Sequence, residues 1–198
     1  MVGSNGPAGE EGQGGAPFEL TQSRDEELLI GIRAGDKNSL EQLYRRHGLH
    51  LTALVTRIFD DHQLAEEVAQ DTFLAVWNGA RFDGRSRVRT WLVAIALRQA
   101  ASRRRKHRFS VASQSADRAS DEPGPEDAAI GAFEAVRMID ELSELTRVQR
   151  EVLLLAFVEE LTQSEIGEVL GVRLGTVKSR MHSAKLAMQR TWQREDSG

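Results

Sequence analysis

The stretch TQSEIGEVLGVRLGTVKSRMHSAK, Thr162 to Lys185, has the pattern of two helices joined by a short turn. Thr162 followed by Glu165 fits a capping box at the start of the first helix, and we expect a second helix from Thr176 to about Arg190. Gly171 between them suits a left-handed turn residue. The arrangement predicts a helix-turn-helix, a motif whose second helix enters the major groove of DNA.

The second of these helices has a polar face that is unusual for an acidic chain. The whole sequence holds 30 Asp and Glu against 26 Lys and Arg, yet this face contains no acid. Its members are small, hydroxylated or cationic: Thr176, Lys178, Ser179, His182 and Ser183. Such side chains reach bases and phosphates easily, so the face indicates DNA binding. A merely solvated cationic face is the alternative.

Composition and charge limit the possible functions. The chain has 198 residues, a formal net charge of −4 and no cysteine, which excludes disulfides and thiolate metal sites. Without a long apolar run or a signal-peptide pattern, the sequence predicts a cytoplasmic protein with no membrane insertion. The charge is uneven, because a basic block over 81–108 is followed by an acidic one over 117–134.

The chain divides into two apolar-periodic blocks and two segments poor in large apolar residues. Residues 1–22 are Gly-rich and predict a disordered tail, and 109–131, with two prolines, predicts a flexible acidic linker. The blocks 23–108 and 132–195 have helical periodicity without alternating β-branched runs. We therefore expect an all-α fold of two small helical domains that move partly independently.

The first block contains a helix with one unexplained apolar residue and a second helix that is basic. Over 61–77, one arc of the helical wheel is polar apart from Leu74. The opposite arc consists of Ala65, Val68, Ala69, Thr72, Phe73 and Val76. Leu74 therefore either packs on another helix of this block or contacts a partner protein. The helix expected over about 90–105 ends in a basic run that suits contact with nucleic-acid phosphates.

Four stretches of the sequence together resemble a known family. They are LIGIRAGDKNSLEQLYRRH (29–47), LAEEVAQDTFLAVW (64–77), RTWLVAIA (89–96) and REVLLLAFVEELTQSEIGEVLGVRLGTVKSRMHSAK (150–185). In this order they are similar to the conserved blocks of bacterial group IV sigma factors, the extracytoplasmic-function (ECF) type. The resemblance implies a protein that is not an enzyme and needs no cofactor or metal. Such a protein binds core RNA polymerase, directs it to specific promoters and assists promoter melting.

The resemblance also implies roles for domains and residues. Block 23–108 is then sigma region 2, which binds core polymerase and the −10 element, and block 132–195 is sigma region 4, which reads the −35 element. The implied polymerase contacts are Glu67, Gln70, Asp71, Leu74 and Trp77. The implied −10 contacts are Arg98, where the family commonly has Asn, and Gln99, Arg103, Arg104 and Arg105. The implied −35 contacts are Arg173, Thr176, Lys178, Ser179, Arg180 and His182.

Partners other than polymerase and promoter DNA follow from the same resemblance. Sigma factors of this type are often inhibited by an anti-sigma factor, so such a protein is a further expected partner.

Neither a short helix-turn-helix nor a single basic helix buries enough surface for tight specific binding of DNA. We therefore expect the free chain to bind DNA poorly without polymerase.

Two other classes of protein fit parts of the sequence. A LuxR-type response regulator has a similar C-terminal module, but its α/β receiver requires strands that the first block does not predict. A metal protein is indicated only by His47, His50 and His62, of which the first two can face one way on a helix. Without a third ligand known to lie near, surface or hydrogen-bonded histidines explain them better.

Overall fold

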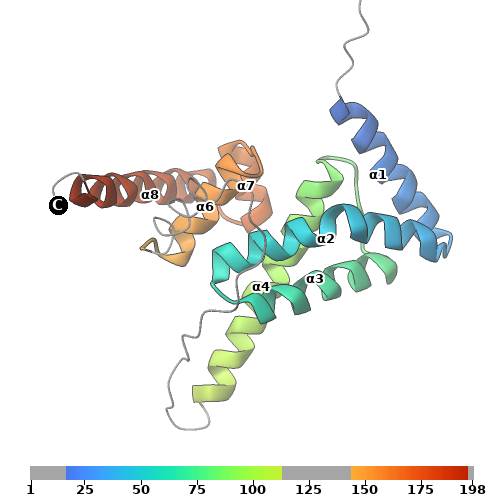
Figure 1. Ribbon diagram of the computed structural model, residues 1–198, viewed down its shortest axis with the longest axis horizontal. Helices are drawn as coiled ribbons and strands as arrows, with labels where there is room; N and C mark the ends of the chain where they lie inside the picture. Colours follow the sequence, from blue (N-terminus) through green and yellow to red (C-terminus); the bar gives the residue numbers. More distant parts are fainter. Residues whose placement is uncertain (1–16, 113–143, 196–198) are drawn as a thin grey trace, which may run out of the picture.

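The computed structural model describes residues 17–112 and 144–195, and all of its regular structure there is helical (Figure 1). The helices are α1 (Pro17–Arg33), α2 (Lys37–Phe59), α3 (His62–Trp77), α4 (Val88–Ala112), α6 (Arg147–Phe157), α7 (Gln163–Leu170) and α8 (Leu174–Glu195). The prediction of an all-α fold is confirmed. Within the same residues, every helix is too short or too polar to cross a membrane.

The N-terminal bundle consists of α1 to α4, with α2 in contact with the other three helices. Asp36 and Asp61 are the N-caps of α2 and α3, and each carboxylate accepts backbone N–H bonds from the first turn. The apolar arc predicted for α3 is buried in full, as expected. His47 Nε2 of α2 lies 2.8 Å from the buried carboxylate of Asp25 in α1, so a buried polar pair joins these two helices.

The C-terminal bundle consists of α6 to α8, and α7 and α8 form the predicted helix-turn-helix. The capping box is present, since Thr162 N donates to Glu165 Oε2 (2.8 Å) and Glu165 N donates to Thr162 Oγ1 (3.3 Å). Gly171 has a φ of 65°, the left-handed conformation expected there. A Cβ at buried Gly167 would lie 3.0 Å from the carbonyl oxygen of Val172, so glycine allows the turn to approach α7 closely.

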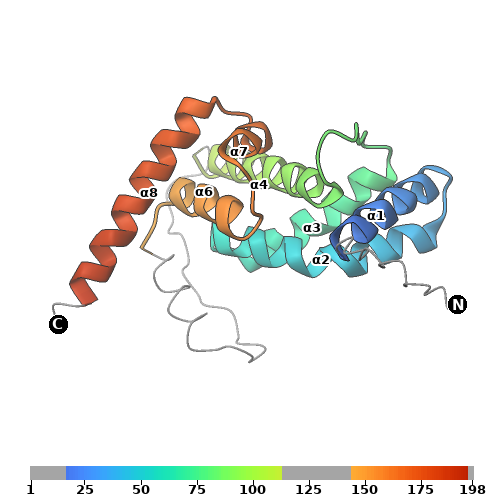
Figure 2. The same cartoon turned by 90° about the horizontal axis from the view of Figure 1, so that it is seen from above.

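The two bundles pack directly against each other. Helix α2 contacts α6 and α4 contacts α7, and the C-terminal bundle lies at the end of the N-terminal bundle opposite α1 (Figure 2). The guanidinium of Arg147 in α6 lies 5.2 Å from the ring centroid of Phe59 in α2. Buried apolar residues of both bundles belong to one continuous cluster. In this structure the two bundles therefore form one packed unit, because packing removes apolar surface of both bundles from water, and the partly independent motion of the two domains stays a prediction.

Three predicted boundaries also need correction. Helix α1 begins at Pro17, inside the predicted tail, because proline suits the first turn of a helix. Helix α4 continues to Ala112, beyond the predicted start of the linker at 109. Helix α8 begins at Leu174 rather than Thr176, since the carbonyl of Arg173 already accepts the N–H groups of the first turn. The rest of the predicted tail and linker lies outside the described residues.

Candidate functional site

The exposed face of α3 carries the residues implied in polymerase binding. Glu67, Gln70 and Leu74 are exposed, and Leu74 leaves 54% of its surface in solvent. Asp71 and Trp77 are half-buried, and Trp77 packs against the apolar core. A leucine that packs internally would be almost fully covered, so the structure excludes that explanation of Leu74. Its side chain is instead available to a partner.

Arg103 of α4 links the two implied surfaces of the N-terminal bundle. Its Nη1 lies 2.6 Å from Glu67 Oε2, its Nε lies 3.1 Å from Asp71 Oδ2, and its Nη2 also bonds Asp71. The hydrogen bond to Asp71, followed by the charges of Asp71 and Glu67, raises the pKa of Arg103 above its ordinary value. Gln99 Nε2 donates to the backbone carbonyl of Asp71 (3.4 Å). Residues assigned separately to DNA and to polymerase therefore lie in one cluster.

The remaining arginines of the basic run are held in different ways. Arg98 is exposed, and its Nε donates to the carbonyl of Ala94 one turn earlier (3.0 Å). Arg104 Nη1 donates to the carbonyl of Phe59 at the end of α2 (2.9 Å). Arg105 is exposed and has no hydrogen bond or ion pair with another described residue. Arg98 and Arg105 are therefore better placed to reach a phosphate than Arg103 and Arg104.

The first turns of α8 present most of the implied −35 contacts to solvent. The exposed members are Arg173, Thr176, Lys178, Ser179 and His182. Val177, Met181 and Ala184 on the other side are buried, so the helix has one covered and one open face. Because no acidic side chain interrupts the open face, it can approach a phosphate backbone without like-charge repulsion.

Arg180 differs from its neighbours because it is half-buried against α6. Its Nη1 lies 3.9 Å from Oε2 of Glu151, whose Oε1 accepts a 3.2 Å hydrogen bond from Arg147. Burial raises the pKa of Glu151 above its ordinary value of 4.5, and the positive charges of Arg147 and Arg180 oppose the rise. In this structure Arg180 therefore contributes to the packing of α8 on α6.

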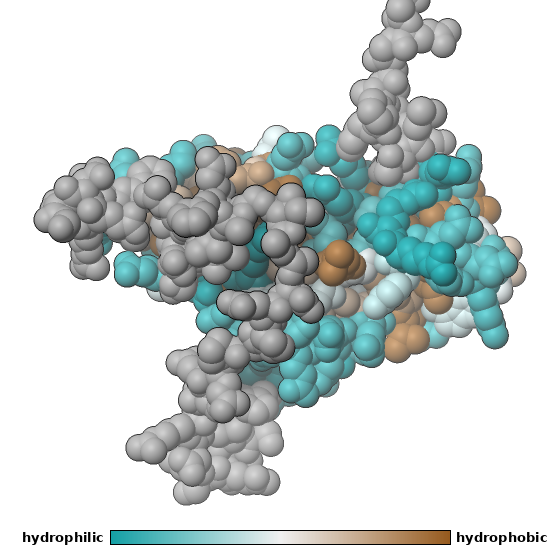
Figure 3. All heavy atoms as spheres, in the orientation of Figure 1, coloured by the Kyte–Doolittle hydropathy of each residue, from teal (hydrophilic) through white to brown (hydrophobic). Residues whose placement is uncertain are grey.

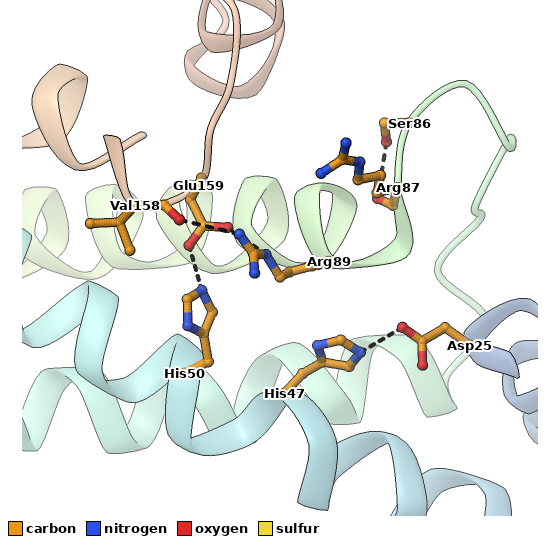
Figure 4. Close-up of polar contacts among 8 residues, drawn as sticks. All are labelled: Asp25, His47, His50, Ser86, Arg87, Arg89, Val158 and Glu159. Carbon is orange, nitrogen blue, oxygen red and sulfur yellow. Dashed lines mark hydrogen bonds and ion pairs between the residues drawn. The ribbon is translucent and has the colours of Figure 1, made fainter. Parts of the chain in front are cut away.

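A polar cluster that sequence reasoning missed joins the two bundles (Figure 4). Glu159 follows α6 and is only 2% exposed, yet it is ionisable. Its carboxylate lies 2.9 Å from Arg89 Nε of α4 and bonds His50 Nε2 of α2. Arg89 Nη2 also donates to the carbonyl of Val158 (3.3 Å). No local sequence signal identifies this cluster, because its members belong to segments far apart in the chain.

The three histidines considered as metal ligands each have a carboxylate neighbour. His47 bonds Asp25, His50 bonds Glu159, and exposed His62 lies 3.3 Å from Glu66. The three imidazoles thus belong to three different polar contacts. Among the described residues, no group of three or more His, Asp or Glu side chains is arranged to hold a metal ion.

Comparison with known proteins identifies the family. The family model of Sigma-70 region 2 matches residues 43–110, and that of Sigma-70, region 4 matches residues 135–188. The "ECF RNA polymerase sigma factor SigK" of Mycobacterium sp. (strain KMS) is 34% identical over 162 residues, which cover 78% of this chain and 83% of the relative. The chain belongs to the ECF sigma factors of RNA polymerase. It is also 29% identical over 168 residues to the "ECF RNA polymerase sigma factor SigL" of Mycobacterium tuberculosis (strain ATCC 25618 / H37Rv), covering 83% and 95% of the two chains.

Solved structures agree with this assignment. CnrH in complex with the cytosolic domain of CnrY superposes with a TM-score of 0.59 at 25% identity, covering 86% of this chain and 98% of that one. The sigma factor RpoE in complex with the anti-sigma factor NepR, from Bartonella quintana, gives a TM-score of 0.61 at 21% identity, covering 77% and 96%. As a sigma factor, the protein acts in transcription initiation with core RNA polymerase and promoter DNA. A response regulator is excluded, because sigma region 2 lies where the receiver domain would be.

Proposed function

We propose that the exposed face of α3 is the surface with which this sigma factor docks on core polymerase. The observation that carries this proposal is Leu74, an exposed leucine on a helix whose other apolar side chains are buried or half-buried. Fully burying an exposed leucine contributes about 1.5–3 kcal/mol, and Leu74, which is 54% exposed, would gain roughly half of that when covered. Beside it lie Gln70 and the carboxylates of Glu67 and Asp71, which pair with Arg103 and give the surface a polar border, and Trp77 extends the surface towards the end of the helix.

The same proposal assigns promoter recognition to two further helices, α4 and α8. Helix α4 faces the −10 element, with Arg98 and Arg105 as the accessible cations and Gln99, Arg103 and Arg104 beside them. Helix α8 reads the −35 element through its acid-free face from Arg173 to His182. The N-terminal bundle, α1 to α4, is then the region 2 domain, and the C-terminal bundle, α6 to α8, is the region 4 domain.

Control by an anti-sigma factor is also part of the proposal. One structural neighbour, RpoE, was solved with the anti-sigma factor NepR. On the face drawn in Figure 3, hydrophilic residues predominate and apolar residues form separate spots. An inhibitor that covers Leu74 on α3 would block polymerase docking directly. We further infer that the protein works in the cytoplasm with polymerase and has no enzymatic activity of its own.

Transcription with purified core polymerase on a library of promoter fragments tests the proposed function. We expect the protein to direct initiation at a subset of fragments that share −35 and −10 sequences, and to bind the same fragments poorly alone. Core polymerase without the protein is the control. Tight, specific duplex binding by the free protein together with no affinity for core polymerase would contradict the proposal.

A further inference from the structure

The contact between the bundles places a carboxylate of the C-terminal bundle in a cationic site of the N-terminal bundle. His50 and Arg89 come from different helices, α2 and α4, and their nitrogens converge on Glu159 (Figure 4). Burying a carboxylate is costly unless cations and hydrogen-bond donors surround it. The N-terminal bundle supplies both, so this part of its surface is suited to an anion whether or not Glu159 is the anion.

A further cation lies beside this site. Arg87 precedes Arg89 by two residues and lies where the preceding loop meets the start of α4 (Figure 4). Hydrogen bonds with Thr162 lower the pKa of Glu165 in α7, and the positive charge of Arg87 adds to the effect. Glu159 therefore pairs with Arg89, and Arg87 adds a favourable charge for a second acid of the C-terminal bundle, Glu165.

The packed arrangement is too compact to read both promoter elements at once. The −35 and −10 elements are named for positions about 25 base pairs apart, which is roughly 85 Å of B-DNA. A compact body of about 150 residues has a radius of gyration of only about 15 Å. Because α4 and α8 belong to bundles in direct contact, the bundles must separate before both helices reach their elements. Separation removes Glu159 from His50 and Arg89.

We propose that His50 and Arg89 form a binding site for a phosphate of promoter DNA, which Glu159 occupies while the two bundles are packed together. The proposal rests on the proposed function, because it takes the −10 DNA to lie along α4. A guanidinium binds phosphate as readily as it binds carboxylate, and an imidazole N–H adds a second donor. Single-stranded DNA and the C-terminal bundle then compete for one site, which is a second reason to expect weak DNA binding by the free chain.

The test uses variants that break the same ion pair from opposite sides. Glu159→Ala removes the competing anion and leaves the cations, whereas Arg89→Ala removes a cation and leaves the anion. The sequence has no cysteine, so Glu27→Cys in α1 and Lys185→Cys in α8, both at exposed positions, provide a unique pair of labels for the distance between the bundles. The probe for the site is a short single-stranded oligodeoxynucleotide, titrated at several salt concentrations without polymerase.

Both substitutions should lengthen the distance between the labels, but only Glu159→Ala should increase DNA affinity. We expect a gain of about tenfold, the value of one charge-assisted hydrogen bond. The salt slope of Glu159→Ala should steepen by about 0.7 for each additional phosphate contact. Equal DNA affinity of the two variants would overturn the phosphate site, and an unchanged label distance in Glu159→Ala would overturn its occupation by Glu159.

Glu160→Ala is the matched control, because it removes an exposed acid at the neighbouring position. It should behave as the parent, and an equal gain in DNA affinity would overturn the proposal by showing that net charge alone is responsible. Circular dichroism of each variant checks that helical content is kept. Failure of the site is distinguishable from failure of the proposed function, since the parent protein would still direct initiation by core polymerase.

Discussion

Glu159 and Arg89 form an ion pair between the two bundles, with Arg89 Nε 2.9 Å from Glu159 Oε2. The two residues lie on opposite sides of the long segment that connects α4 to α6 in the sequence. Their pairing places the loop after α6 against the start of α4. The two helices proposed to face the promoter, α4 and α8, thus belong to bundles that touch in this structure, whereas the proposed reading of both promoter elements needs the bundles to be apart.

The turn of the helix-turn-helix provides a stability prediction with an internal control. Gly171 has a φ of 65°, so Gly171→Ala should lower the free energy of unfolding by about 1–2 kcal/mol. Gly175, in the first turn of α8, has no positive φ, and a Cβ there would meet only open space, so Gly175→Ala should be neutral or stabilising by up to about 1 kcal/mol. Urea unfolding measures both. Equal destabilisation by the two changes would contradict the assigned turn conformation.

Glu151 predicts a pH dependence of stability. Burial raises its pKa in the folded protein above the ordinary 4.5, so the folded state favours the protonated carboxyl. Its contribution to stability is therefore fully present below about pH 4.5 and is lost as the pH rises through the folded pKa. In Glu151→Gln this dependence should disappear, so the parent should lose stability relative to the variant between pH 4.5 and neutral pH.

Urea unfolding of parent and variant over this pH range measures the difference. Subtracting the two curves removes the titration of all other groups. Glu168→Gln, at an exposed position of α7, is the control for the removal of a carboxylate from the C-terminal bundle. A difference for Glu151→Gln that moves in the opposite direction would show that Arg147 and Arg180 outweigh burial.

Features set by local sequence were predictable. The buried arc of α3 follows from helical periodicity alone, the capping box at Thr162 follows from the Thr162 and Glu165 side chains, and the left-handed turn at Gly171 follows from the absence of a Cβ. The family resemblance added the order of the two regions. Periodicity also identified Leu74 as exceptional, but only the structure decided between internal packing and exposure.

Contacts between distant segments were not predictable. Arg103 belongs to a basic run of the kind that contacts DNA. Nothing near it in the sequence indicates that it pairs with Glu67 and Asp71 of another helix. Likewise, Glu159 is one of 30 acidic residues, and its burial depends on packing between bundles. Such pairings are fixed by tertiary geometry, which periodicity and charge pattern do not contain.

Leu74→Glu tests the proposed polymerase surface. A charge at this exposed position should leave the helical content nearly unchanged, while affinity for core polymerase falls because apolar contact area is lost and a buried charge is introduced. Leu49→Glu is the matched control, since Leu49 of α2 is 83% exposed and lies outside the proposed surface. Loss of fold in Leu74→Glu, or an equal loss of polymerase affinity in both variants, would contradict the assignment.

Lys178→Ala tests the proposed −35 surface. Lys178 is exposed near the start of α8 on the face without acids, so its removal should leave polymerase binding intact. If Lys178 contacts a base, recognition of promoters that depend on the −35 element should weaken by about 1–3 kcal/mol. If it contacts only phosphate, binding to all sequences should weaken together and the salt slope should decrease by about one.

Promoter binding by the assembled holoenzyme, measured at several salt concentrations with matched and altered −35 sequences, separates these two outcomes. Lys37→Ala is the control, because it removes the same exposed charge from α2, outside both proposed surfaces. The decisive comparison is between surfaces: Leu74→Glu should fail at polymerase binding and Lys178→Ala at promoter recognition. If both variants initiate transcription as well as the parent at limiting protein concentration, the assignment of α3 and α8 to these two partners is wrong.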